Sequence, residues 1–210
     1  MKFLVKKQFG FREKHSTYMA ILNLDDTISQ EIDSKNYFMG IFIDLSKAFD
    51  TIHHTILIDK LEYYGIRGVA LQWFISYLSK RSQYVKIGDI CSNCLHLTCG
   101  VPQGFILGRL LFLVHINDIV NVSALVDFLM FADDTNLFIS SYSLESLCVT
   151  ANTVLAKLAK WFRLNKLFLN VNKTKYILFH IHQKKLLTQI KLTIDNITIE
   201  QTDKTKVRDY

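Results

Sequence analysis

Residues 125–140 read LVDFLMFADDTNLFIS, which is two apolar runs interrupted by Asp133, Asp134 and Thr135. Apolar runs of this length with turn-forming aspartates between them predict two strands joined at residues 132–135. An Asp pair in a turn is, by itself, ordinary turn chemistry. Here the flanking residues are so apolar that most of the hairpin is expected to be buried. Neighbouring carboxylates in such a setting repel each other unless a cation neutralises them.

A second acid closes an apolar run upstream. Residues 37–45, YFMGIFIDL, are continuously apolar except for Asp44, which predicts a strand buried on both faces. The alternative interpretation is that Asp44 is an ordinary solvated acid at the end of a strand. If this strand lies beside the hairpin, Asp44 joins Asp133 and Asp134. Carboxylates are ligands of Mg²⁺, and two such ions about 4 Å apart can activate an attacking 3′-hydroxyl and stabilise a leaving pyrophosphate.

Periodicity and turn signals place the other elements. The pattern of strands, hairpins and helices predicts an α+β fold, with an antiparallel sheet and helices packed on one face. Ser143 is expected to cap a strongly amphipathic helix. The remaining predictions are helices over 14–32, 53–63, 67–80 and 104–120, a hairpin of SQYVKI with CLHLT, a strand over 175–180 and a hairpin around Asp195-Asn196.

Composition narrows the class of protein. Half of the 210 residues are apolar, so a large core is expected, and the net charge of +6 favours a polyanionic partner such as nucleic acid. No apolar stretch is long enough for a membrane span or a signal peptide, and we expect an intracellular, reduced chain. Cys91, Cys94, His96 and Cys99 superficially suggest zinc, but their spacing is too cramped, so a hairpin that carries thiols is preferred.

The segment GVPQGFILG, residues 100–108, is a third feature with chemical meaning. Its three glycines allow close backbone approach, and Pro102, the only proline, fixes the turn. Gln103 places an amide at the mouth of a predicted helix. In a nucleotide-using enzyme this segment would cradle a sugar, a base or the template.

Six segments resemble, in family order, the reverse transcriptase domain of non-LTR retrotransposons of the LINE type. The resemblance covers about residues 8–180, and six segments in register are far more specific than one F-A-D-D. The segments are QFGFREKHST (8–17), FIDLSKAFDTIHH (42–54), GIRGVALQWFISYLSKRSQYV (65–85), GVPQGFILGRLLFLVHINDI (100–119), FADDTNLF (131–138) and LNKLFLNVNKTKYILF (164–179).

The resemblance implies a polymerase palm with a partial fingers region and no thumb. It divides the chain into a partial fingers segment (1–36), a palm and fingers core (37–180) and a C-terminal hairpin with a truncated palm–thumb junction (181–210). It implies an RNA-directed DNA polymerase that uses two Mg²⁺ ions, with Mn²⁺ as an alternative, an RNA template, a DNA primer and deoxynucleoside triphosphates. Protein partners stay unknown, and no membrane is involved.

The resemblance also implies roles for side chains. Asp44, Asp133 and Asp134 would bind the metals, and the Phe42 to Leu45 backbone would help to hold the second metal and the triphosphate. Phe49 would lie under the incoming sugar and exclude a 2′-hydroxyl. The other implied roles are nucleotide or template contact for Gln103 and Gly104, protonation of pyrophosphate for Lys173 or Lys175, and a place near the template or triphosphate for Arg12.

Several of these residues have plainer interpretations. Phe49 would serve equally as core, and Lys173 with Lys175 as a solvated basic edge. We interpret Asp50, Asn117 and Asp118 as structural. His53-His54 receives no metal role.

Three residues depart from the family pattern: Phe105 replaces Ser, Arg109 replaces Pro and His115 replaces Tyr. A charge at position 109 in a buried helix would cost several kcal/mol unless it is paired or exposed. With the fingers segment before residue 8 and the thumb expected to be missing, weak or no processive synthesis is expected from this chain alone. A catalytically inactive relic that keeps the palm is therefore the alternative function. A metal-dependent nuclease or phosphatase is disfavoured because it needs neither the P-Q-G segment nor Phe49.

Overall fold

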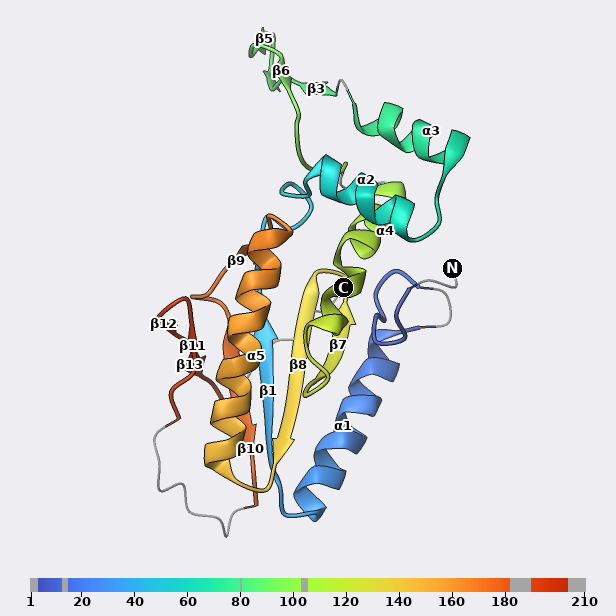
Figure 1. Cartoon of the computed structure of the whole chain (residues 1–210). Helices are drawn as coiled ribbons and strands as arrows, with labels where there is room; N and C mark the ends of the chain where they lie inside the picture. Colours follow the sequence, from blue (N-terminus) through green and yellow to red (C-terminus); the bar gives the residue numbers. More distant parts are fainter. Residues whose placement is uncertain (1–3, 13–14, 80, 103–105, 182–189, 204–210) are drawn as a thin grey trace.

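A five-stranded sheet forms the centre of the computed structural model, which describes residues 4–12, 15–79, 81–102, 106–181 and 190–203. The strand order is β13-β10-β1-β8-β7 (Figure 1). β1 (Tyr37–Ile43) is central and pairs antiparallel with β8 (Asp134–Ser141) and β10 (Lys175–Phe179). β7 (Asp127–Phe131) pairs antiparallel with β8, and the short β13 (Glu200–Gln201) pairs parallel with β10. The predicted antiparallel sheet is confirmed for the four longer strands, and β13 adds a parallel edge.

The two faces of β1 are both covered, because its side chains are apolar on both. Met39 and Ile41 are fully buried in the main core, beneath α5 (Leu144–Leu164). Phe38 points to the other face, into a smaller cluster with Ala20 of α1 (Thr17–Asp33). The sequence predicted helices on one face only. The structure corrects this point, because the apolar residues of the second face also have to leave water and α1 covers them.

Helix α5 supplies most of the cover on the main face. Ser143 caps it as predicted, with its Oγ accepting from the Ser146 N–H at 3.5 Å. The middle of its apolar stripe is buried, and Leu147, Val154 and Leu158 are at most 1% exposed. Each such side chain contributes roughly 1.5–3 kcal/mol by leaving water. This stripe fixes the position of α5 over the sheet.

A half-buried lysine joins three further elements. Lys60, on α2 (His54–Tyr63), donates to the backbone oxygen of His115 at 2.5 Å and to Asp118 at 2.6 Å. These acceptors lie on α4 (Ile106–Ile116) and the following 3-10 helix η1 (Asn117–Val122). The ammonium also lies 4.9 Å from the ring centroid of Trp161 on α5. Burial lowers the pKa of Lys60, while the Asp118 carboxylate opposes that shift. Asp118 is structural, as predicted.

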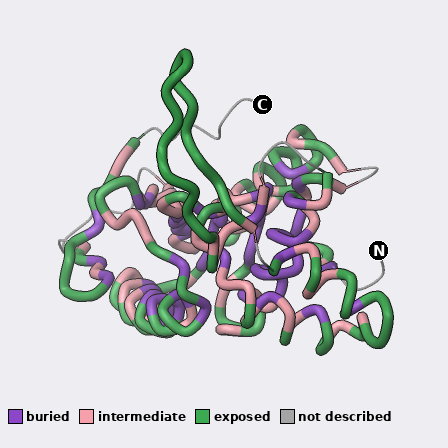
Figure 2. The backbone as a smooth tube through the Cα atoms, turned by 90° about the horizontal axis from the view of Figure 1, so that it is seen from above, coloured by how far each residue is buried: buried purple, intermediate pink, exposed green. Residues whose placement is uncertain are grey.

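The predicted hairpin after α3 (Gly68–Leu78) stands away from the core. Figure 2 shows it as the exposed loop that projects from the rest of the chain. It contains two short ladders, β3 (Ser82–Gln83) with β6 (Leu95–His96) and β4 (Lys86–Ile87) with β5 (Ile90–Cys91). Residues 82–96 are all exposed, so this hairpin contributes little to the core.

Two short two-stranded ladders complete the described part of the fold. β2 (Leu45–Ser46) pairs with β9 (Phe168–Leu169) directly after Asp44. β11 (Thr193–Ile194) and β12 (Ile197–Thr198) form the predicted hairpin, in which Asp195 and Asn196 have φ of 48° and 67°, as a tight two-residue turn requires. Among the described residues, no helix combines the length and the apolar character that a membrane crossing needs.

Candidate active site

The register of the central strands brings the predicted acids to one end of the sheet. β1 and β8 pair up to Ile43 opposite Thr135. Asp44 and Asp134 are the next residues beyond this last pair, so a continued register would set them opposite each other. Directly opposed residues in an antiparallel pair have Cα atoms about 4.5–5.5 Å apart and side chains on the same face. The backbone therefore brings the end of β1 and the β7–β8 turn to the same end of the sheet, whereas the meeting of the three side chains stays a prediction.

Asp133 belongs to the tight turn between β7 and β8. Phe131 pairs with Asp134, which leaves Ala132 and Asp133 as a two-residue connection. Ala132 is 1% exposed and has a φ of 56°, in the left-handed region that costs a non-glycine residue about 1 kcal/mol or more. The turn projects Asp133 beside Asp134, both half-buried, at the tip of the hairpin.

The Asp44 backbone is held by Asn170 and Thr174, which lie in the family-like segment at 164–179 but received no role from the sequence. Its carbonyl oxygen accepts from the Asn170 N–H at 2.9 Å, and its N–H donates to Thr174 Oγ1 at 3.5 Å. Thr174 is fully buried and its hydroxyl donates to the Asn170 carbonyl at 3.0 Å. Asn170 and Thr174 therefore fix the end of β1. The sequence signal for this role is their place in the segment LNKLFLNVNKTKYILF (164–179), where the resemblance to the family extends to residues 170–175, NVNKTK.

The three aspartates lie at one end of the sheet, but their side chains do not form a ready-made three-ligand cluster. Across the described residues, no three His, Cys, Asp or Glu side chains come together as a group that could hold a metal ion. Carboxylates repel one another until a cation lies between them. The donor set itself fits Mg²⁺, which takes one or two protein carboxylates together with water and substrate phosphate.

Phe49 is fixed by packing and by its backbone. Its half-buried ring stacks on the fully buried Phe112 of α4, with centroids 4.6 Å apart and an angle of 29° between the rings. Its carbonyl oxygen accepts from the Val101 N–H at 2.9 Å. The ring therefore contributes to the core and is also held rigidly. Its role as a gate against the 2′-hydroxyl stays a prediction.

The turn at residues 99–102 is locked between two neighbouring segments. The Gly100 N–H donates to the carbonyl oxygen of Ile52 at 2.8 Å. The Nε2 of His54 forms a hydrogen bond with the carbonyl oxygen of Gly100 at 2.7 Å. Gly100 has a φ of 87°, and a Cβ there would lie 3.0 Å from the Asp50 oxygen. A Cβ on Gly108 would lie 2.0 Å from the Pro102 oxygen. Close backbone approach at these glycines is thus confirmed, whereas the predicted contacts of Gln103 and Gly104 lie outside the described residues.

The two candidate lysines differ in their surroundings. Lys175 lies on β10 and forms an ion pair with Glu200 of β13, and the hydrogen bond and charge of Lys175 lower the pKa of that carboxyl. Lys173 is exposed in the turn that holds Asp44, where its N–H donates to the Asn170 oxygen at 3.1 Å. Lys175 is thus occupied by an ion pair, and the role of Lys173 as a proton donor stays a prediction.

Arg12 is bound to its own loop. Its Nη1 donates to the carbonyl oxygens of Val5 at 2.7 Å and Gln8 at 3.1 Å. These bonds stabilise the turn that carries residues 5–8. A contact of Arg12 with template or triphosphate remains a prediction.

Comparison with known proteins identifies the family. The family model described as "Reverse transcriptase (RNA-dependent DNA polymerase)" matches residues 1–207. The chain belongs to this reverse transcriptase family. It is 33% identical over 186 residues to the "Probable RNA-directed DNA polymerase from transposon BS" of Drosophila melanogaster, an alignment that covers 82% of this chain and 20% of that protein.

Other relatives agree with a non-LTR retrotransposon origin. The RNA-directed DNA polymerase from mobile element jockey of Drosophila melanogaster is 27% identical over 152 residues, which cover 71% of this chain and 16% of that protein. The Pol polyprotein from the type-1 retrotransposable element R2 of Popillia japonica is 26% identical over 218 residues, with 97% and 30% covered. The predicted non-LTR resemblance is confirmed. This reverse transcriptase chain spans about a fifth of the length of the curated relatives it matches first.

Solved structures support the fold of the reverse transcriptase chain. A telomerase from Candida tropicalis in complex with a fragment of telomeric RNA superposes with a TM-score of 0.59 at 15% identity. The match covers 89% of this chain and 32% of the telomerase. A second telomerase structure from the same species gives a TM-score of 0.58 at 15% identity, with 92% and 39% covered. The predicted palm fold is confirmed.

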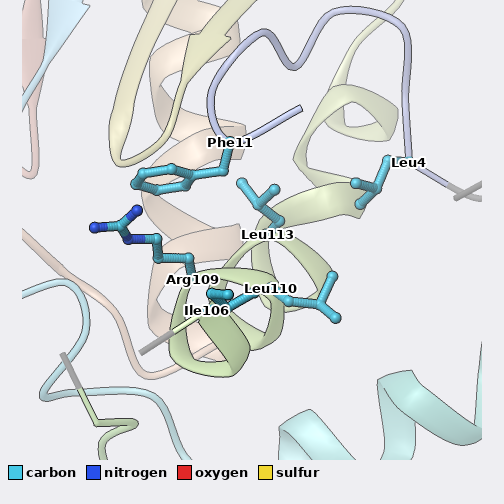
Figure 3. A pocket seen from close by; sticks show the side chains of 6 residues that line it. All are labelled: Leu4, Phe11, Ile106, Arg109, Leu110 and Leu113. Atoms are coloured by element: carbon cyan, nitrogen blue, oxygen red, sulfur yellow. The ribbon is translucent and has the colours of Figure 1, made fainter. Parts of the chain in front are cut away.

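The departure at position 109 of the reverse transcriptase pattern is accommodated at the surface. Arg109 is exposed, and its guanidinium carbon lies 4.9 Å from the ring centroid of Phe11 (Figure 3). Both side chains border a cavity of about 210 Å³ that is otherwise lined by Leu4, Ile106, Leu110 and Leu113. The burial cost anticipated from the sequence does not arise, because the charge is both exposed and paired with a ring.

Proposed function

We propose that this chain is the polymerising core of a non-LTR retrotransposon reverse transcriptase, an RNA-directed DNA polymerase. One observation carries the proposal: the β1–β8 ladder ends with Ile43 opposite Thr135, so that Asp44 and Asp134 are the next residue of each chain segment, beside the turn that carries Asp133. Opposed and adjacent acids from two neighbouring strands are what two-metal nucleotidyl transfer requires. The family model matched over nearly the whole chain supports the same conclusion.

Asp44, Asp133 and Asp134 would hold two Mg²⁺ ions, or Mn²⁺ as an alternative. When bound, the ions would lower the charge on the reacting phosphates and favour ionisation of the primer 3′-hydroxyl. Asn170 and Thr174 keep the Asp44 backbone in place at the end of β1. The Phe42 to Leu45 backbone would face the triphosphate, and Lys173 would supply a proton to the departing pyrophosphate.

Substrate choice would depend on rigid packing beside these acids. Phe49 is held by Phe112 and by the Val101 N–H, so its ring cannot yield easily to a bulkier sugar. A 2′-hydroxyl would therefore be excluded by steric contact. Gln103 and Gly104 would contact the nucleotide or template, and Arg12 would lie near the template or triphosphate.

The partners follow from the reaction. An RNA template, a DNA primer and deoxynucleoside triphosphates are the substrates, and the net charge of +6 suits these polyanions. We place the chain inside the cell. The division into a partial fingers segment (1–36), a palm and fingers core (37–180) and a C-terminal piece (181–210) is part of the same proposal.

The experiment is single-nucleotide incorporation on a radiolabelled DNA primer annealed to an RNA template, with Mg²⁺. A single addition avoids any demand for processive synthesis. Asp133→Asn removes one carboxylate charge and should abolish incorporation, because the charges that hold the cations act together. Asp127→Asn is the matched control, since Asp127 lies on the same hairpin, pairs with Lys7 at 2.8 Å and is exposed.

Two results separate the candidate functions. Incorporation by the wild-type and Asp127→Asn chains but not by Asp133→Asn supports the polymerase. A folded wild-type chain that binds primer–template but adds no nucleotide supports the inactive relic instead. Cleavage of nucleic acid without incorporation would point to a nuclease.

A further inference from the structure

The side chain of Gln8 is buried and forms hydrogen bonds with the backbone of the turn that precedes the two aspartates, although Gln8 lies far away in the sequence. Gln8 is 1% exposed. Its side-chain oxygen accepts from the Ala132 N–H at 3.1 Å, and its side-chain nitrogen donates to the Ala132 oxygen at 3.4 Å. The Gly10 N–H donates to the same side-chain oxygen at 2.8 Å, which fixes the orientation of the amide. One side chain thus binds both polar backbone groups of Ala132.

The backbone around Gln8 packs against the same hairpin. The Phe9 N–H donates to the Met130 oxygen at 2.8 Å, and the Met130 N–H donates to the Lys7 oxygen at 2.9 Å. Residues 7–9 therefore add a parallel bridge to the free edge of β7. Gly10 lies so close that a Cβ on it would stand 2.1 Å from the Ala132 nitrogen. Only glycine allows this contact without displacing the turn.

The turn needs such support. Ala132 is buried in a left-handed conformation that alanine adopts at a cost, and without Gln8 its N–H would lose the acceptor named above. Because Asp133 follows directly, any change in the Ala132 dihedral angles moves both carboxylates. A group that holds both peptide bonds of Ala132 therefore sets the direction of both acids.

We propose that Gln8 and Gly10 are positioning residues for the aspartate pair, which they hold in the geometry that metal binding and nucleotide addition require. This inference rests on the proposed polymerase function. Sequence reasoning treated QFGFR as a family segment without a role for Gln8. The structure assigns the segment a task at the hairpin tip, more than 120 residues away along the chain.

The primary variant is Gln8→Met, which keeps the volume and removes all three hydrogen bonds. We expect the Mg²⁺ half-saturation concentration to rise, or kcat to fall, by about 10- to 100-fold, which is the usual effect of losing a group that orients metal ligands. The KM for primer–template should not change, because Gln8 is buried. Hydrogen exchange of the Ala132 amide should become faster. Gln72→Met, on the exposed side of α3, is the matched control and should resemble wild type.

Gln8→Glu tests the hydrogen bonds of Gln8, because its activity should depend on pH in a way that a role in packing alone would not produce. The protonated acid still accepts from Ala132 and Gly10 and donates to the Ala132 oxygen, whereas the carboxylate places a negative charge against that oxygen. The ratio of Gln8→Glu activity to wild-type activity should therefore rise as the pH falls. Gly10→Ala should show the same loss of Mg²⁺ affinity, since its Cβ pushes the turn away.

The outcomes are distinguishable. A folded Gln8→Met chain with wild-type Mg²⁺ response and wild-type exchange at Ala132 overturns the inference while the polymerase proposal stands. If Gln8→Met does not fold, a Gln8→Glu ratio that is flat with pH overturns it instead. If the wild-type chain adds no nucleotide, the proposed function fails, and Mn²⁺ binding measured by electron paramagnetic resonance together with Ala132 exchange still decides the role of Gln8.

Discussion

Mild acid should destabilise this chain through one side chain, His115. The residue is fully buried on α4, and its Nε2 lies 3.3 Å from the Asn165 carbonyl oxygen. Within the part of the chain that the structure describes, its Nδ1 has no hydrogen-bond partner. Burial and then the nearby Lys60 charge lower the pKa of His115 from 6.5 to about 3, against a smaller opposing effect of the Asn165 bond. The folded chain therefore favours the neutral ring of His115.

The sign and size of the effect follow from linkage. Because the folded-state pKa is depressed, the contribution of His115 to stability is present above pH 6.5 and is lost as the pH falls from 6.5 towards 3. Near pH 5 the unfolded chain protonates almost fully and the folded chain hardly at all. The resulting loss is about 2 kcal/mol relative to neutral pH. Any folded-state pKa below about 4 gives nearly the same result at that pH.

Urea denaturation near pH 7 and pH 5 measures this loss. Between pH 7 and pH 5, wild type should lose about 2 kcal/mol more of its free energy of unfolding than His115→Leu does. This difference does not depend on the absolute stability of the variant. His96→Leu, on the exposed hairpin, is the matched control and should keep the wild-type pH response. Equal pH responses of wild type and His115→Leu would refute the reasoning.

Two further predictions concern the site. Phe49→Val should raise the ratio of kcat/KM for ribonucleotides to that for deoxynucleotides by about tenfold or more, because the ring no longer meets the 2′-hydroxyl; an unchanged ratio in single-nucleotide incorporation would make Phe49 a core residue only. Gly108→Ala should lower the free energy of unfolding by about 1–3 kcal/mol, since the new Cβ would stand 2.0 Å from the Pro102 oxygen. Urea denaturation checks this, with Ile106→Ala on the exposed side of the same helix as the near-neutral control.

Patterns within single segments predicted most of the elements. The interrupted apolar run at 125–140 gave the β7–β8 hairpin with the acids at its tip, and the run at 37–45 gave a strand buried on both faces. Ser143 capped its helix, and Asp195-Asn196 made the turn of its hairpin. These features depend on side-chain period and on turn preferences of a few neighbouring residues, which a sequence displays directly.

Some side chains could not be interpreted from local pattern. Arg109 looked costly in a buried helix, yet it lies at the surface over Phe11. Lys173 and Lys175 looked equivalent, yet Glu200 pairs with only one of them. In each case the residue that contacts the side chain comes from a distant segment, so the neighbouring sequence does not predict the contact.

The amino-acid sequence by itself determined which strands end in acids and which family the segments resemble. Only the tertiary structure decided how those acids are held: by the β1–β8 ladder that ends at Ile43 and Thr135, the Thr174 bond to Asp44 and the hydrogen bonds of Gln8 to Ala132. These contacts join segments between about 90 and 130 residues apart. Apolar burial brings such segments together, and backbone hydrogen bonding then selects one register, so the arrangement exists only in the folded chain.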